Sequence, residues 1–147
     1  MNLYEKHKPS ISKAIDALHT RTFYAAFPEH PAPAIYGETA DADGQEAFKN
    51  QVGKNFDQLL QTGEQSWGGQ EESPYMQTLL NIQYPLFKAE MLVANANKAF
   101  HTWRKVDVET RAGILAESLE RMKKRFFEIA YATMHTTGQG YMMAFQA

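Results

Sequence analysis

The residues that could do chemistry are scattered along the 147-residue sequence rather than grouped. Cysteine is absent, which excludes disulfides, thiolate metal ligands and a cysteine nucleophile. The G-x-S-x-G motif of a serine nucleophile is missing as well. No two of the five histidines have the three- or four-residue spacing that places two metal ligands on one helix face: they are His7, His19, His30, His101 and His135. We therefore predict no catalytic residue and no metal site in this chain.

One glycine pair could suggest a phosphate-binding loop, at Gly138-Gln139-Gly140. A dinucleotide loop needs a third glycine and a preceding strand, so that the next helix directs its N-terminus at a pyrophosphate. Met143 stands where that third glycine would be, and a helix is predicted before the pair. We interpret the pair as a helix–turn–helix joint and predict no cofactor-binding residue.

A short basic cluster is interleaved with carboxylates. Its basic residues are Arg121, Lys123, Lys124 and Arg125, and the acidic ones are Glu117, Glu120 and Glu128. Opposite charges three to four residues apart indicate a solvated helix face with ion pairs. With a net charge of −2, we expect no nucleic-acid partner.

Methionines near aromatic residues leave an alternative open, a pocket for an apolar ligand. At helical spacing, such residues more often form a core. The methionines concerned are Met122, Met134, Met142 and Met143.

The elements that would have to position any site are mostly helical. We expect a first helix over 10–26, with Pro9 before its first turn and a stripe of Ile11, Ile15, Leu18 and Thr22. Closely spaced prolines predict an extended loop over 28–40. A second helix starts near Asp41 or Asp43, which are good N-caps, and glycine shortens it.

The second half of the chain has the clearer helical pattern. A lone strand over 75–84 needs a partner from elsewhere in the chain, from a second subunit or from a region outside it. Helices are predicted over 86–103 and from Asp107 through His135, ending at Gly138. The fold class expected is therefore a mostly α chain with at most one or two short strands. An apolar run ends the sequence at Ala147, where we expect a truncated boundary.

Membrane and export signals are not evident. No stretch approaches the roughly 20 apolar residues of a membrane span. The N-terminal ten residues are polar and lack the pattern of a secretory signal. We expect no membrane partner and a cytoplasmic location.

Four motifs in order carry a resemblance to a known family. They are Ala99-Phe100-x-x-Trp103-Arg104, Arg111-Ala112-x-Ile114-Leu115, Phe127-Glu128-Ile129-Ala130 and Thr137-Gly138. Their order and spacing, over about 77–138, resemble the N-terminal helical region of the aldehyde dehydrogenase superfamily. The segment 135–147, together with Glu72-Ser73-Pro74-Tyr75 and Tyr84-Pro85, is most similar to the branch that opens rings in phenylacetic acid degradation, which acts on a coenzyme A thioester. Thr136 stands where many members have Glu, and Gln139 where many have Lys.

This resemblance implies a parent enzyme that oxidises an aldehyde with NAD or NADP through a catalytic cysteine. Because the chain has no cysteine, the nucleophile lies elsewhere, and the cofactor-binding strands of the family lie beyond residue 147. The resemblance implies one helical domain over 1–147, with a family-specific extension over 1–74 and the truncated start of the dehydrogenase-like region over 75–147. It also makes Tyr141, Met142 and Phe145 candidates for lining the substrate entrance.

Three interpretations of the whole chain remain open, the third of which is a small independent enzyme. In the first, the chain is an N-terminal fragment of such a dehydrogenase, inactive alone, whose partner is the missing remainder or a second copy. In the second, it is a stand-alone helical interaction or oligomerisation module without enzymatic activity. The first predicts exposed apolar surface where other parts dock.

Overall fold

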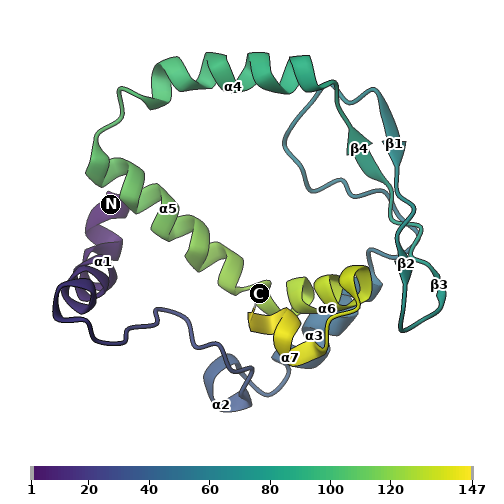
Figure 1. Ribbon diagram of the computed structural model, residues 1–147, viewed down its shortest axis with the longest axis horizontal. Helices are drawn as coiled ribbons and strands as arrows, with labels where there is room; N and C mark the ends of the chain where they lie inside the picture. Colours follow the sequence, from purple (N-terminus) through teal and green to yellow (C-terminus); the bar gives the residue numbers. More distant parts are fainter. Residues whose placement is uncertain (1, 147) are drawn as a thin grey trace.

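The computed structural model describes residues 2–146, and its elements follow one another around an open ring (Figure 1). The helices are α1 (Leu3–Thr20), α2 (Pro33–Tyr36), α3 (Ala40–Lys49), α4 (Ala89–Trp103), α5 (Val108–Lys123), α6 (Phe126–Thr137) and α7 (Tyr141–Gln146). The strands are β1 (Ser66–Gly68), β2 (Glu72–Ser73), β3 (Thr78–Leu79) and β4 (Tyr84–Leu86). The mostly helical fold class is confirmed. The described residues form four strands, each only two or three residues long, where one or two were expected.

Helix α1 begins earlier than predicted. The side chain of Asn2 caps it by accepting a hydrogen bond from the Tyr4 backbone at 3.0 Å, so Pro9 lies inside the helix rather than before it. Pro9 has no backbone N–H, so the carbonyl of Glu5 lacks its helical hydrogen-bond donor. Both residues are exposed, so water can supply the missing hydrogen bond. The prediction of a start at Ser10 was therefore wrong.

The face that α1 buries overlaps the predicted stripe only in part. The half-buried residues recur at three- to four-residue spacing and include Tyr4, His7, Ile11 and Ala14. This face lies on α5, where Gly113 is buried against the Tyr4 backbone. Ile11 belongs to both sets, but Ile15 and Leu18 are 46% and 77% exposed, although residues four and seven positions after Ile11 lie near its side of a helix. The predicted stripe is therefore on about the right side of α1 but is not covered at Ile15 and Leu18.

The loop before α3 contains one helical turn that was not expected, α2, which begins at Pro33. Helix α3 starts after Thr39 and ends at Lys49, so neither Asp41 nor Asp43 is its N-cap. We predicted that glycine shortens this helix. The helix ends at Lys49, and Gly53, four residues beyond that end, has a φ of +75° that a helix does not allow.

The strand near residue 84 finds its partner within the chain. β4 pairs antiparallel with β1, with Trp67 opposite Pro85, and β2 pairs with β3. Residues 66–73, which lie before the predicted strand, supply β1 and β2, so neither a second subunit nor another region is needed for pairing.

The single helix predicted from Asp107 to His135 is two helices. Asp107 caps α5 as expected, accepting a hydrogen bond from the Thr110 backbone at 2.8 Å. The helix ends at Lys123, and Arg125 then leaves helical geometry, with φ −119° and ψ 9°. The break redirects α6 so that Phe127 is buried against Gly44 of α3. At the other end, Gly138 closes α6 in the left-handed conformation, with φ +78°, as predicted.

The core is small and lies where α3, α6 and the strands meet. Its buried cluster consists of Phe48, Leu80, Ile82 and Tyr131. In contrast, α4 is exposed along almost its whole length, with only Met91 half-buried. It forms one side of the ring, with no helix beside it (Figure 1). The fold thus consists of a packed corner and a long uncovered arm.

Candidate functional site

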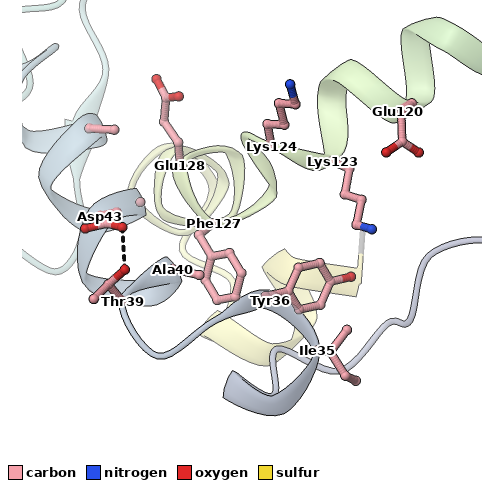
Figure 2. A pocket seen from close by; sticks show the side chains of 12 residues that line it. Ile35, Tyr36, Thr39, Ala40, Asp43, Glu120, Lys123, Lys124, Phe127 and Glu128 are labelled. Carbon is pink, nitrogen blue, oxygen red and sulfur yellow. Dashed lines mark hydrogen bonds between the residues drawn. The ribbon is translucent and has the colours of Figure 1, made fainter.

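The largest hollow lies between α2, α3 and the α5–α6 corner, with a volume of about 640 Å³ (Figure 2). The Tyr36 and Phe127 rings meet edge to face in it, with centroids 5.4 Å apart. Burial raises the pKa of the Tyr36 phenol, whose hydroxyl donates to the Pro28 carbonyl. Lys123 reaches toward Tyr36, whereas Lys124 and Glu128 point the other way. The interior of the hollow is therefore aromatic, and charged side chains lie at its margin.

Two of the charged groups around this hollow, Asp43 and Glu128, are engaged in hydrogen bonds. Asp43 accepts a hydrogen bond from the Thr39 hydroxyl at 2.8 Å. Both Glu128 oxygens accept from the Arg125 guanidinium at 2.7 Å. No group of three potential metal ligands occurs among residues 2–146.

Ser73 and His135 form a pair of the kind that could suggest a nucleophile and its base. The Ser73 Oγ lies 2.7 Å from His135 Nδ1, and the imidazole stacks on the Phe48 ring at 4.7 Å. Burial lowers the pKa of His135, and the charge of Lys49 lowers it further. However, Ser73 is 0% exposed, so a substrate could not reach its hydroxyl. We interpret the pair as a structural hydrogen bond that joins β2 to α6.

Asp41 connects three helices through one carboxylate oxygen. Its Oδ1 accepts hydrogen bonds from the hydroxyls of Tyr131 on α6 and Tyr141 on α7. Burial raises the pKa of Tyr131 to about 12, and the neighbouring carboxylate contributes to the increase. The pKa of Tyr141 is raised for the same reasons. This cluster fixes α7 against α3 and α6.

The three residues predicted to line a substrate entrance all lie on α7 but have different surroundings. Tyr141 is held by Asp41, Phe145 packs on the rings of Tyr36, Phe126 and Phe127, and Met142 is exposed. Their role at an entrance stays a prediction. The glycine pair before them joins α6 to α7, as the helix–turn–helix interpretation predicted.

The other side-chain predictions have mixed outcomes. Arg121 and Arg125 form the expected ion pairs, with Glu117 and Glu128. The methionines are not gathered into one pocket: Met134 packs on the core, whereas Met122, Met142 and Met143 are exposed. Sequence reasoning missed the pairs of Asp41 and of Ser73, because their partners lie 62 to 100 residues away and leave no periodic signal.

The uncovered face of α4 is the most extensive unexplained surface. Apolar residues at helical spacing line it and are exposed: Leu92, Val93, Phe100 and Trp103. Contiguous apolar surface of this kind marks sites where other protein parts bind. No helix among residues 2–146 has the length and apolar character to cross a membrane. The candidate functional surface is therefore the apolar face of α4.

Comparisons with known proteins agree with this description. Residues 86–146 match the profile of the Aldehyde dehydrogenase family. Over 99% of its length, the chain is similar to the crystal structure of an NAD-dependent aldehyde dehydrogenase from Burkholderia multivorans, with 41% sequence identity and a TM-score of 0.90. The chain spans 26% of the length of that protein. No curated protein was found to match it.

Proposed function

We propose that this chain is the N-terminal, non-catalytic part of an NAD-dependent aldehyde dehydrogenase subunit and that α4 docks on the rest of that subunit. The observation that carries the proposal is the uncovered apolar face of α4, in a chain similar to about a quarter of such an enzyme. The alternative, a stand-alone module, would need a closed surface along this helix.

Physical chemistry explains why α4 should be covered. An isolated helix of 15 residues is only marginally stable in water. Burying a large apolar side chain such as Leu92 or Phe100 contributes about 1.5–3 kcal/mol. Leu92, Val93, Phe100 and Trp103 are 39–59% exposed, so covering all four would stabilise α4 by about 3–6 kcal/mol, before the entropy of docking is subtracted.

The described residues do not fit a dinucleotide cofactor. The only glycine pair of the expected kind in residues 2–146, Gly138-Gln139-Gly140, follows a helix and precedes α7, which has six residues. No strand precedes it to direct a helix N-terminus at a pyrophosphate. In the proposed subunit, the rest of the polypeptide therefore supplies both the cofactor site and the nucleophile.

A narrower proposal concerns the pathway. The resemblance of segment 135–147 to the ring-opening branch supports a role in phenylacetic acid degradation, in the cytoplasm. The whole segment carries this resemblance, and within it Thr136 and Gln139 depart from the commoner Glu and Lys, which argues against a simple aldehyde as substrate. If this is correct, the complete enzyme will prefer an aldehyde carrying a coenzyme A thioester over a simple aldehyde. Equal kcat/KM for both would contradict the narrower proposal alone.

A chimera tests the main proposal. Residues 1–147 would replace the similar segment of the Burkholderia multivorans dehydrogenase, and NADH formation from an aldehyde would be followed by absorbance. We expect activity from the chimera, and none from this chain alone or from the dehydrogenase without the segment. A chimera that folds, with the native size and a cooperative melting transition, but forms no NADH would contradict the proposal. A chain that closes α4 by self-association would favour the stand-alone module.

A further inference from the structure

Two hollows flank the corner between α5 and α6, on apolar surface that no described element covers. The larger, of about 450 Å³, is lined by Phe48, Phe56, Ile82, Tyr84 and Ala132 among others. The smaller, of about 220 Å³, is lined by Phe27, Phe126, Ala144, Phe145 and Gln146 among others. Met122 and Ile129 line both, so the two hollows form one surface, which we call the α5–α6 groove.

The floor of this groove is preformed. Phe48 and Ile82 belong to the buried core, and the Phe56 and Tyr84 rings pack on it with centroids 5.8 Å apart. Met122 and Ile129 stand between the hollows and are 46% and 39% exposed. An occupant would therefore gain apolar contacts without first rearranging the core.

Charges at the rim of the larger hollow do not oppose an apolar occupant. Arg125 donates two hydrogen bonds to Glu128, and Arg121 donates to Glu117 at 3.1 Å. Covering the larger hollow would thus bury paired charges rather than isolated ones, and isolated buried charges carry the large penalty. Glu29, at the smaller hollow, forms no ion pair among the described residues, so the occupant would have to leave this carboxylate in contact with water. Recognition of the occupant would therefore depend mainly on apolar contacts and on how well its shape fits the groove.

The position of Gln146 indicates what occupies the groove. Gln146 lies at the end of α7 and lines the smaller hollow. In a longer polypeptide, the residues after 147 would start at this point. Because Met122 and Ile129 line both hollows, a chain that continues from the smaller hollow into the larger one would pass over these two residues.

We propose that the segment directly following residue 147 of the longer subunit binds the α5–α6 groove and covers Met122 and Ile129. The proposal rests on the proposed function, since it needs such a continuation. The occupant is an amphipathic segment whose apolar side chains recur at the spacing of one helix face or one strand face. It is distinct from the part of the subunit that covers α4.

Binding in trans tests this assignment. The chain 1–147 would be titrated with the remainder of the Burkholderia multivorans dehydrogenase, and with a shorter remainder that lacks its first roughly 20 residues, enough for a helix of about 30 Å. Isothermal titration calorimetry would give Kd for the wild-type chain and for Met122→Glu, Ile129→Glu and Val108→Glu. Val108 is the matched control, since it lies at the start of α5, is 70% exposed and lines neither hollow.

We expect Met122→Glu and Ile129→Glu each to weaken binding of the complete remainder by roughly tenfold, because a carboxylate would be buried without a partner. Val108→Glu should bind like the wild type. The shorter remainder should bind the wild-type chain more weakly than the complete remainder does. Its Kd should be the same for the wild-type chain and for Met122→Glu, because the segment that contacts residue 122 is missing, and the four Kd values together form a double-mutant cycle. Unchanged circular dichroism and melting of each variant would show that the chain itself remains folded.

Other outcomes would overturn the assignment. If Met122→Glu weakens both remainders equally, another segment occupies the groove. If the chain dimerises and Met122→Glu abolishes the dimer, the occupant is a second copy. An active chimera combined with unchanged Kd for Met122→Glu contradicts the groove proposal alone. An inactive but folded chimera combined with no binding of either remainder contradicts the proposed function as well.

Discussion

Gly113 of α5 lies directly against the backbone of Tyr4 in α1, so close that a Cβ atom at position 113 would overlap the Tyr4 nitrogen. The overlap is with backbone, which cannot rotate away. The side chains around this contact belong to the half-buried face of α1. The absence of a side chain at residue 113 is therefore what allows α1 to approach α5.

The Gly113→Ala substitution should destabilise the chain, although alanine usually favours a helix by up to about 1 kcal/mol over glycine. Forcing extra atoms into a packed contact costs about 1–3 kcal/mol, and here the contact is with backbone. We expect a net decrease in the free energy of unfolding, measured by urea denaturation. Gly140→Ala is the control, because a Cβ there meets nothing within 4 Å. Equal stability of both variants would contradict the close packing of α1 on α5.

Glu117 should make the docking of α1 sensitive to acid. Its Oε2 accepts a hydrogen bond from Lys6 Nζ at 2.6 Å and lies 2.7 Å from His7 Nε2. The Lys6 ammonium, followed by His7 and Arg121, lowers the pKa of Glu117 from 4.5 to about 2. Because the folded-state pKa is lowered, the stabilisation is complete above pH 4.5 and is lost as the pH falls toward about 2.

The Glu117→Gln variant checks this pH dependence. At pH 7 the variant should be less stable than the wild-type chain. As the pH falls from 4.5 to about 2, the difference should disappear, because the Glu117 carboxylate of the wild type becomes protonated in this range. Glu120→Gln, on the same helix, provides the comparison. The melting temperatures of the wild type and of both variants would be measured across this pH range. The same pH dependence for Glu117→Gln and Glu120→Gln would refute the role of Glu117.

Asp41 should control the ionisation of two tyrosines. Replacing it with Asn removes the negative charge next to Tyr131 and Tyr141, while their burial remains. The pKa of Tyr131 should therefore fall from about 12 but stay above 10, since burial is its main cause. In the wild type, the stabilisation from this raised pKa is present below pH 10 and is lost as the pH rises toward about 12.

NMR of the tyrosine ring carbons would follow both titrations. The control is Asp43→Asn, because Asp43 accepts from Thr39 rather than from a tyrosine. An unchanged Tyr131 pKa in Asp41→Asn, or an equal decrease in Asp43→Asn, would argue against the hydrogen bonds that join α3, α6 and α7.

Local signals in the sequence were enough to locate several features. Asp107 and Gly138 mark the ends of their helices because capping depends only on the adjacent residues. The break at Arg125 was missed because apolar periodicity continues through it. What decides the break is the packing of Phe127 on Gly44, more than 80 residues earlier in the chain.

Long-range contacts explain the remaining differences. The stripe of Ile11, Ile15 and Leu18 is a reasonable helix face, but only Ile11 is half-buried on the side of α1 that lies on α5, and Ile15 and Leu18 are exposed. The partner of β4 lies in a glycine-rich segment that has no strand pattern. Exposure of apolar surface was predictable from the family resemblance, whereas its location on α4 and in the α5–α6 groove required the structure.

Hydrogen exchange of α4 tests the central claim most directly, because it reports whether this helix is covered. Backbone amides of α4 would be compared with those of α6, whose buried residues provide an internal reference, in the chain alone and in the chimera. We predict that α4 exchanges much faster than α6 in the chain alone and becomes protected in the chimera. If α4 is already as protected as α6 in the chain alone and does not change in the chimera, the rest of the subunit does not cover it, and the account is contradicted.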